Sequence, residues 1–440
     1  MEKNREFFGT RLGFVLAAAG SAVGLGNMWR FPYQTAEGGG AAFVLLYVLM
    51  TFLIGVPIMA AEFAVGRRSR LSPIGALRKI GGVRWVPLGW LLVFTPLVIL
   101  AYFSVVCGWS LRYALDALGG FAASPAERYA EVSTGLPAIE FHLVLMAVTI
   151  VIVMAGVRKG IERAGLILMP TLFVIVIGLA LWAATLSGSG QGYSFYLRPS
   201  LDALLSPVVF QQAASQAFLS LSVGMGIMVT YGSYLPRREN LNQEAVLVSL
   251  SDFSVAFIAG LIVFPVIFAL GLSDQVSNST IGALFISLPG AFFEMGMVGR
   301  VVGFVFFVAL VVAGLTSSFS LLEVGTASFM DEFKLPRKTA AVLAGSGAAI
   351  AGLFPALSQN TLGILDKVVG ELLVVGGVLG MALFVGWSMD HPESELLEGT
   401  SPFFRRLVPV AMFLLRYVIP PFIGVILWFS FKDTVALVFD

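Results

Sequence analysis

The sequence has few of the residues on which most enzymes and secreted domains depend. Its 440 residues include one cysteine, Cys107, and two histidines, His142 and His391. A single cysteine excludes an internal disulfide, and two isolated histidines without a nucleophile motif argue against an enzyme. Charge is also scarce, because Asp, Glu, Lys and Arg make up 12% of the chain and leave a net charge of +1. With no dense basic tract, the sequence does not predict binding to nucleic acid.

Apolar residues dominate the composition instead. The chain is 58% hydrophobic, with a mean hydropathy of +0.91. Apolar runs of about twenty residues, each long enough to cross hydrocarbon, recur along the whole length. We therefore predict an all-α integral membrane protein with eleven transmembrane helices. The predicted spans are 12–35, 41–66, 87–115, 141–156, 164–186, 205–234, 244–271, 300–329, 339–356, 365–389 and 408–430.

Basic residues gather before the first predicted span and in every second connection after it. Lys and Arg concentrate in cytoplasmic loops. We therefore predict a multi-pass protein of the cell membrane with a cytoplasmic N-terminus and an external C-terminus. The residues concerned are Lys3, Arg5, Arg11, Arg67, Arg68, Arg70, Arg78, Lys79, Arg84, Arg158, Lys159, Arg163, Arg237, Arg238, Lys334, Arg337, Lys338, Arg405 and Arg406.

The first predicted span is interrupted by Gly20-Ser21-Ala22-Val23-Gly24-Leu25-Gly26-Asn27. Each glycine lowers helix stability by about 1 kcal/mol relative to alanine. Unpaired backbone at membrane depth is tolerated only where it is buried in protein or lines a cavity. Broken helices of this kind mark the ion and substrate sites of secondary transporters. A close helix–helix contact built on small residues is the alternative interpretation.

A second interruption, Ser220-Leu221-Ser222-Val223-Gly224-Met225-Gly226, falls five spans after the first. Because five is odd, two five-span halves with the same layout must lie inverted in the membrane, as in many secondary transporters. We predict a single transmembrane domain over residues 1–431. It would contain five-helix repeats at 1–190 and 200–390, with helices 1 and 6 broken, and an accessory helix at 405–431.

Few ionisable residues lie within the predicted spans. Asp252 stands in an apolar span, and no basic residue near it in the sequence can neutralise it. Such residues usually face the bundle interior or a water-filled path, so Asp252 is a candidate functional residue, with a structural ion pair as the alternative. The hydroxyls of Thr316, Ser317 and Ser318 are a second candidate cluster, although such groups commonly bond the carbonyl four residues earlier.

Six segments resemble, in the same order, the neurotransmitter:sodium symporter family and its bacterial amino-acid transporters. The matching segments are Arg5, 10–14, 20–33, 216–222, 230–234 and 313–318. The predicted count of eleven spans is similar to a bacterial subgroup that lacks the last helix of the usual twelve. The resemblance implies a sodium-coupled symporter that carries a small amino acid or an amino-acid-like zwitterion by alternating access.

The resemblance also implies the roles of individual residues. The first sodium site would comprise Ala22, Asn27, Ser220 and Asp252, and the second Gly20, Val23, Ala313, Thr316 and Ser317. Substrate would contact Ser21, Ala22, Leu25, Gly26, Phe103, Leu219, Ser220, Ser222, Met225, Ser317 and Leu321. The outer gate would pair Arg30 with Asp366, and the inner gate Arg5 with Asp331, with Tyr234 nearby.

The sequence departs from the family pattern at four positions. Asp252 replaces a common asparagine, Phe103 a tyrosine, Leu219 a phenylalanine and Phe8 a tryptophan. The changes at 103 and 219 leave open a β-amino acid or sulfonate substrate, and a channel is a further alternative. The resemblance implies two sodium ions. Because Asp252 supplies a fixed negative charge and Ala256 lacks the hydroxyl of chloride-dependent relatives, we expect no chloride.

Overall fold

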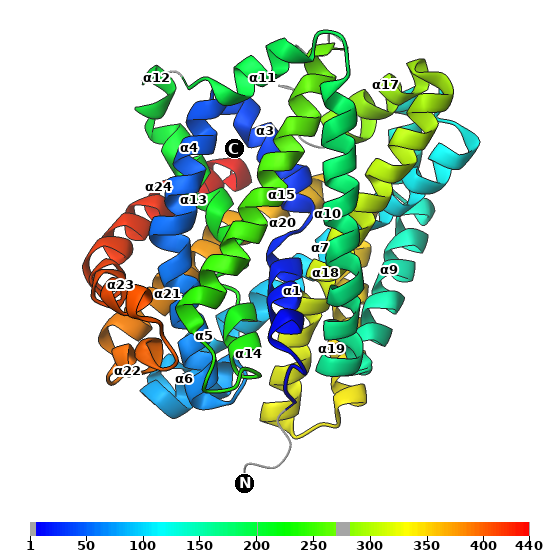
Figure 1. Ribbon diagram of the computed structural model, residues 1–440. Coiled ribbons are helices and arrows are strands. Elements are labelled where there is room, and N and C mark those ends of the chain that lie inside the picture. Colours follow the sequence, from blue (N-terminus) through cyan, green and yellow to red (C-terminus); the bar gives the residue numbers. More distant parts are fainter. Residues whose placement is uncertain (1–5, 200, 270–281, 440) are drawn as a thin grey trace.

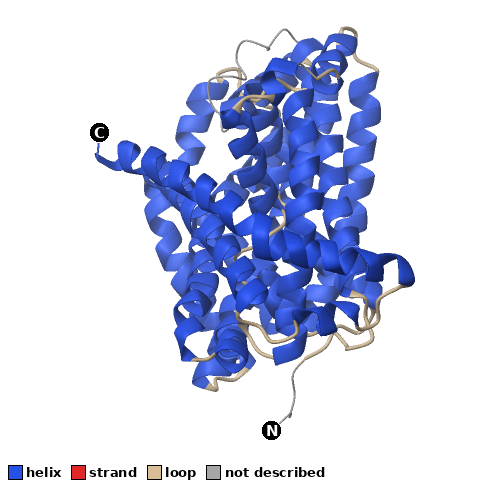
Figure 2. Ribbon diagram, turned by 90° about the vertical axis from the view of Figure 1, so that its left-hand side faces the viewer, coloured by secondary structure: helices blue, strands red, loops and turns tan. Residues whose placement is uncertain are grey.

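The computed structural model describes residues 6–199, 201–269 and 282–439. Every regular element in these ranges is a helix, and Figure 2 shows the helices gathered into one bundle. Such a bundle is the expected outcome for long apolar segments, because a helix satisfies its own backbone hydrogen bonds within lipid.

In the described part of the chain, nine helices are long and apolar enough to cross a membrane, and a bent pair makes a tenth. The pair is Arg11–Ala22 with Leu25–Glu37, and the nine are Ala41–Ser69 (α4, η1, α5), Val83–Gly119 (η2, α7), Leu136–Met154 (α9), Val157–Ala184 (η3, α10), Leu241–Ala269 (α15), Gly296–Phe333 (α18), Arg337–Leu357 (α19), Gln359–Trp387 (α20, η5, α21) and Pro402–Lys432 (α23, η6, α24). The protein is therefore a multi-pass membrane protein.

The first predicted interruption is present. Helix α1 (Arg11–Ala22) ends at Ala22, and Val23 and Gly24 adopt extended backbone before α2 (Leu25–Met28) and α3 (Arg30–Glu37) continue the span. The two parts of the span are inclined by 55°.

The second predicted interruption is present as well. Helix α13 (Pro207–Ser220) stops where predicted, and the chain resumes as α14 (Ile227–Gly232). Between them Ser222, Gly224 and Gly226 have φ values of 55°, 74° and 70°. Left-handed backbone is costly for residues with a side chain, so Ser222 is held there by its surroundings. Each half is too short to span a membrane alone, and for this reason the predicted span 205–234 is not among the nine.

Several helix boundaries differ from the prediction. The fourth span begins at Leu136 rather than near 141, directly after Gly135, whose φ is 76°, and with Pro137 in its first turn. Within this helix His142 is buried, and its ring nitrogens bond Ser104 Oγ and the Ala349 carbonyl, both at 2.9 Å. The eighth span, α18, is longer than 300–329. The last span, Pro402–Lys432, begins before 408, and its final helix, α24 (Ile419–Phe439), continues beyond 430. Polar residues that find partners inside the bundle do not end a helix.

The remaining elements are short and connect the spans. They are α6 (Pro73–Gly81), α8 (Pro125–Ser133), α11 (Ser189–Leu197), α12 (Leu201–Leu204), η4 (Ala283–Ser287), α17 (Leu288–Glu294) and α22 (Pro392–Leu397). Within the bundle, α1 packs against α10, α15 and α18, while α13 packs on α4 and α14 on α5 (Figure 1). Both interruptions are thus enclosed by other helices rather than exposed to lipid.

Candidate functional site

A cavity of about 250 Å³ lies between the two interruptions, and we call it the central cavity. Residues of both broken helices line it, together with residues of α7, α18, α20 and η5. Its lining consists of Ser21, Ala22, Gly24, Gly26, Asn27, Trp29, Arg30, Gln34, Ile99, Tyr102, Phe103, Gln216, Leu219, Ser220, Ser222, Met225, Ser317, Leu321, Asp366, Lys367 and Glu371.

Asp252 lies fully buried beside this cavity, and neutral groups surround its carboxylate. Asn27 Nδ2 donates to Oδ1 at 2.6 Å, and the Tyr47 hydroxyl donates to Oδ2 at 2.8 Å. The Ser220 hydroxyl lies 2.8 and 3.0 Å from the two carboxylate oxygens. No ion pair joins Asp252 to a basic residue in the described ranges. The distant arginine that would make Asp252 purely structural is therefore not found there.

A second group of oxygens lies where α18 meets the break in the first span. Ser317 Oγ is 3.3 Å from the Gly20 carbonyl, 3.5 Å from the Val23 carbonyl and 3.3 Å from the Ala313 carbonyl. The Thr316 hydroxyl bonds the Ala313 carbonyl of its own helix at 3.0 Å. A Cβ added to Gly20 would come within 3.1 Å of Thr316 Cβ, so α1 and α18 approach closely here.

Two contacts hold the second interruption in place. The Ser222 hydroxyl donates to the Ser21 carbonyl at 3.0 Å and so ties the two breaks together. The Gly224 N–H donates to Glu62 Oε1 at 2.7 Å. Gly377 packs directly on Gly224, since a Cβ at Gly377 would lie 1.9 Å from the Gly224 carbonyl oxygen. The intramembrane Glu62 therefore serves as an anchor for unwound backbone.

Most residues assigned to substrate by resemblance line the central cavity. Leu25 is the exception, because its buried side chain is directed to α18, near Gly314. Ile99 and Tyr102 also line the cavity, which the sequence did not reveal. Helical spacing could have revealed Ile99, which lies four residues, about one turn, before Phe103.

At the outer end of the cavity, Arg30 and Asp366 are both lining residues, but no ion pair joins them. Arg30 Nη1 is buried without a hydrogen-bond partner. Tyr102 lies close enough to interact with both charged groups. The predicted outer pair therefore contributes to the cavity wall without closing it in this structure.

At the inner end, the predicted partner Arg5 lies outside the described residues. Asp331 Oδ2 accepts a hydrogen bond from the Ser72 N–H at 2.7 Å, and the Tyr234 hydroxyl donates to Glu323 at 2.6 Å. The ring of Phe8, which replaces a tryptophan of the family pattern, is 93% buried and packs edge-on against Tyr234 at 6.1 Å. Tyr234 therefore takes part in this inner region through Glu323, a partner that the sequence did not reveal.

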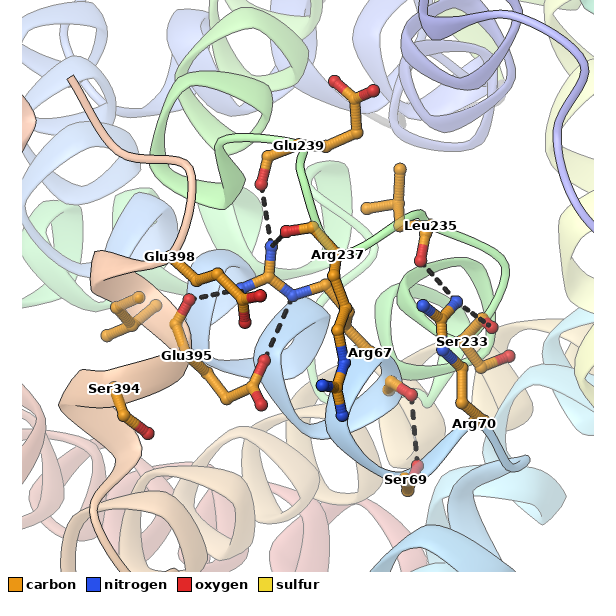
Figure 3. A network of polar contacts seen from close by, with 12 residues as sticks. Arg67, Ser69, Arg70, Ser233, Leu235, Arg237, Glu239, Ser394, Glu395 and Glu398 are labelled. Carbon is orange, nitrogen blue, oxygen red and sulfur yellow. Dashed lines mark hydrogen bonds and ion pairs between the residues drawn. The ribbon is translucent and has the colours of Figure 1, made fainter.

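The same face is closed by a polar network around Arg67, drawn in Figure 3. The side chain of Arg67, at the end of α5, is fully buried and donates to Glu395 Oε2 at 3.1 Å. It also donates to the carbonyls of Arg237 at 3.1 Å and Glu239 at 2.7 Å. Arg70 donates to the Leu235 carbonyl beside it. This network fixes α22 and the segment after α14 to the end of α5.

Comparison with known proteins gives consistent matches. The model of the sodium:neurotransmitter symporter family matches residues 5–122 and 131–394. An uncharacterized sodium-dependent transporter of Bacillus subtilis, YhdH, is 33% identical over 431 residues, covering 93% of this chain and 94% of that protein. The bovine sodium-dependent neutral amino acid transporter B(0)AT2 is 31% identical over 313 residues, covering 62% of this chain and 42% of that protein.

The fold is also similar to a solved structure. The crystal structure of MhsT in complex with L-phenylalanine superposes with a TM-score of 0.88 at 37% identity, covering 97% of this chain and 100% of that chain. The likeness therefore extends over nearly the whole molecule, including both interrupted helices.

Proposed function

The chain belongs to the sodium:neurotransmitter symporter family, and from that premise we propose that it is a sodium-coupled symporter for a small neutral amino acid or a related zwitterion. The observation that carries the proposal is the central cavity, with the Asp252 carboxylate and the Ser317 hydroxyl lying beside its two breaks. Relatives named as sodium-dependent transporters and the phenylalanine complex of MhsT support it.

We propose the following architecture. The nine long helices and the bent first pair make ten spans, and α13 and α14, counted together as one interrupted span, make the eleventh. Residues 1–190 and 200–390 would form inverted repeats within the domain 1–431, and 405–431 would form an accessory helix. The distribution of basic residues supports a cytoplasmic N-terminus and an external C-terminus.

Two sodium ions would bind beside the central cavity. At the first site the carboxylate of Asp252 would combine with Ser220, the Ala22 carbonyl and Asn27. A half-turn of the Asn27 amide would bring its oxygen, which now accepts from the Gly24 N–H at 2.9 Å, toward the ion. The second site would use the carbonyls of Gly20, Val23 and Ala313 with the hydroxyls of Thr316 and Ser317. Hard cations prefer such oxygen ligands.

The substrate would be held between the two breaks. Half-helix ends present N–H groups to an anion, so the N–H groups of Leu25 and Gly26 would bind a carboxylate. Because Gly24 has no side chain, it offers no carboxylate to an ammonium group of the substrate. A Cβ at this position would lie only 2.7 Å from Ser317 Oγ. This supports a zwitterion rather than a lone amine.

The substrate's side chain would face an apolar wall. That wall consists of Ile99, Phe103, Leu219, Met225 and Leu321. Because Leu219 leaves space that a phenylalanine would fill, we propose a medium to bulky apolar side chain. The absence of a hydroxyl at position 103 keeps a β-amino acid or a sulfonate as the alternative.

A thermal-shift screen of the purified protein tests the substrate class. In the presence of sodium, we expect neutral apolar amino acids to raise the melting temperature, and the effect should vanish when choline replaces sodium. A ligand at about 100 times its Kd stabilises the folded state by about 2.7 kcal/mol. If only acidic or cationic amino acids stabilised the protein, the substrate assignment would be wrong, whereas a preference for β-amino acids or sulfonates would favour the alternative.

The gates would be ion pairs that form and break during the cycle. We propose Arg30 with Asp366 outside, and Arg5 with Asp331 inside, with Tyr234 nearby. Exchanging the charges of the outer pair, Arg30→Asp with Asp366→Arg, should restore part of the uptake that each single change removes. The measurement is sodium-driven uptake at equal expression. A double variant no better than the worse single variant would contradict the pairing.

A further inference from the structure

A second cavity opens on the flank of the molecule, where α22, α23 (Pro402–Phe413) and η6 (Leu414–Val418) meet. Its volume is about 610 Å³, and none of its lining residues belongs to the central cavity. We call it the flank groove. Figure 1 places these helices at the edge of the bundle, away from the two interruptions. Its lining includes Glu393, Leu397, Arg405, Phe413, Arg416 and Tyr417.

The wall formed by α22 is held rigidly. Arg67 binds both the side chain and the backbone of Glu395, and Asn242 Nδ2 donates to the Leu396 carbonyl at 2.8 Å. Gly399, just after α22, packs on the backbone of Arg238, because a Cβ there would come within 2.5 Å of that carbonyl oxygen. The groove therefore lies on the same face as the basic segment 237–238, the predicted cytoplasmic side.

Three exposed aromatic side chains lie together at the groove. The ring centroid of Tyr417 lies 5.6 Å from that of Trp387 and 5.6 Å from that of Phe413. These three side chains are 56%, 62% and 57% exposed. Aromatic residues collect at the headgroup level of a bilayer, where their rings meet both apolar and polar surroundings. The groove thus has an exposed aromatic wall of the kind found where the headgroups of a bilayer meet its hydrocarbon.

The groove carries one positive charge that the protein does not compensate. The charge of Arg416 is already paired, since its Nη2 lies 2.9 Å from Glu393 Oε1. Its Nε also donates to the Gly386 carbonyl at 2.9 Å. Arg405 is exposed at the rim and forms no ion pair with any residue that the structure describes. An anion near Arg405 would gain charge complementarity without displacing an existing pair.

We propose that the flank groove binds one anionic phospholipid of the cytoplasmic leaflet, with the headgroup phosphate at Arg405 and the acyl chains along Phe413 and Tyr417. Basic pockets at the cytoplasmic ends of membrane helices suit anionic headgroups. A free phosphate would leave the apolar lining unused, and a neutral lipid would leave Arg405 uncompensated. The bound lipid bridges α22 and α23 and so stabilises the start of the last helix.

The test uses the full-length protein, delipidated in a neutral detergent. Binding of phosphatidylglycerol and of phosphatidylcholine with the same acyl chains is measured by native mass spectrometry, with the melting temperature as a second readout. We expect one tightly retained phosphatidylglycerol and no comparable retention of phosphatidylcholine. Arg405→Gln should weaken this binding about fivefold, the loss expected for one basic residue near an anionic headgroup.

Two further variants separate charge from structure. Arg405→Lys keeps the charge and should retain most of the affinity. Arg238→Gln is the matched control, because that side chain is 87% exposed on the same face but lies outside the groove. It should change the affinity less than about twofold, since a surface charge beyond the contact is screened by salt.

Four results would overturn the proposal. Equal retention of the two lipids would show that the charge of Arg405 is not recognised. An unchanged affinity in a folded Arg405→Gln variant would place the lipid elsewhere. Stabilisation by glycerol phosphate, which has no acyl chains, equal to that by phosphatidylglycerol would indicate a soluble anion. A mass corresponding to two protein copies, with lipid excluded, would likewise assign the groove to a dimer contact.

Discussion

Replacing Thr316 with valine and Ser317 with alanine should abolish sodium-driven uptake while leaving the protein folded. The double variant removes both hydroxyl oxygens from the proposed second sodium site and keeps the close packing of α18 against Gly20. Losing two oxygen contacts to a cation, each worth about 1.5–3 kcal/mol, should lower sodium affinity by roughly a hundredfold or more. Sodium titration of substrate binding provides the measurement.

Ser318→Ala is the matched control for this experiment. The Ser318 hydroxyl lies in the same stretch of α18 but bonds the Gly314 carbonyl of its own helix at 2.8 Å. Its removal should leave sodium dependence within a factor of about two, because a hydroxyl bonded within its own helix contributes little to other sites. If the double variant bound substrate with unchanged sodium dependence, the second site would be wrongly assigned.

Asp252→Asn should weaken sodium-dependent substrate binding at least tenfold or make uptake respond to chloride. The substitution preserves the size of a side chain that accepts from Asn27, Tyr47 and Ser220, but it removes the charge. Two unit charges about 4–5 Å apart interact by a few kcal/mol at an effective dielectric constant near 20. Losing an attraction of a few kcal/mol to a sodium ion would weaken sodium binding by more than tenfold, since about 1.4 kcal/mol corresponds to a factor of ten in affinity.

The chloride dependence of uptake tests the negative charge of Asp252 in a second way. In the unmodified protein, replacing chloride with gluconate should leave uptake unchanged, because a second anion beside Asp252 would be repelled by a few kcal/mol. Ser251→Ala is the control for Asp252→Asn and should leave uptake independent of chloride, since the Ser251 hydroxyl bonds the Leu247 carbonyl of its own helix at 2.8 Å. Strong chloride dependence of the unmodified protein would contradict the charge argument.

Local composition was enough to locate the interruptions. The cost of three glycines within Gly20–Gly26 outweighs helix propensity, and the structure interrupts the helix there. Gly224 and Gly226 likewise predict the break between Ser220 and Ile227. An unneutralised Asp252 in an apolar span indicated a polar surrounding, since a buried charge requires partners. Asn27 and Ser220, which the family resemblance named, are among them.

Contacts between residues distant in the sequence could not be predicted in this way. The partners of the buried His142, Ser104 Oγ and the Ala349 carbonyl, lie on other helices. That Arg30 and Asp366 form no ion pair here, and that Tyr102 lies near both charged groups, depends on the conformation of the whole bundle. One wall of the flank groove, α22, is bound by Arg67, which lies more than three hundred residues earlier in the chain.

The most direct test of the account is uptake into proteoliposomes that contain the purified protein as their only transporter. With an inward sodium gradient, the labelled amino acid found in the thermal-shift screen should accumulate above its external concentration. Uptake should saturate, be inhibited by unlabelled substrate and stop when choline replaces sodium or when the gradient is dissipated. Coupling requires that each ligand raise the affinity of the other by the same factor. Uptake that is independent of the sodium gradient, or a flux that does not saturate, would contradict sodium-coupled symport.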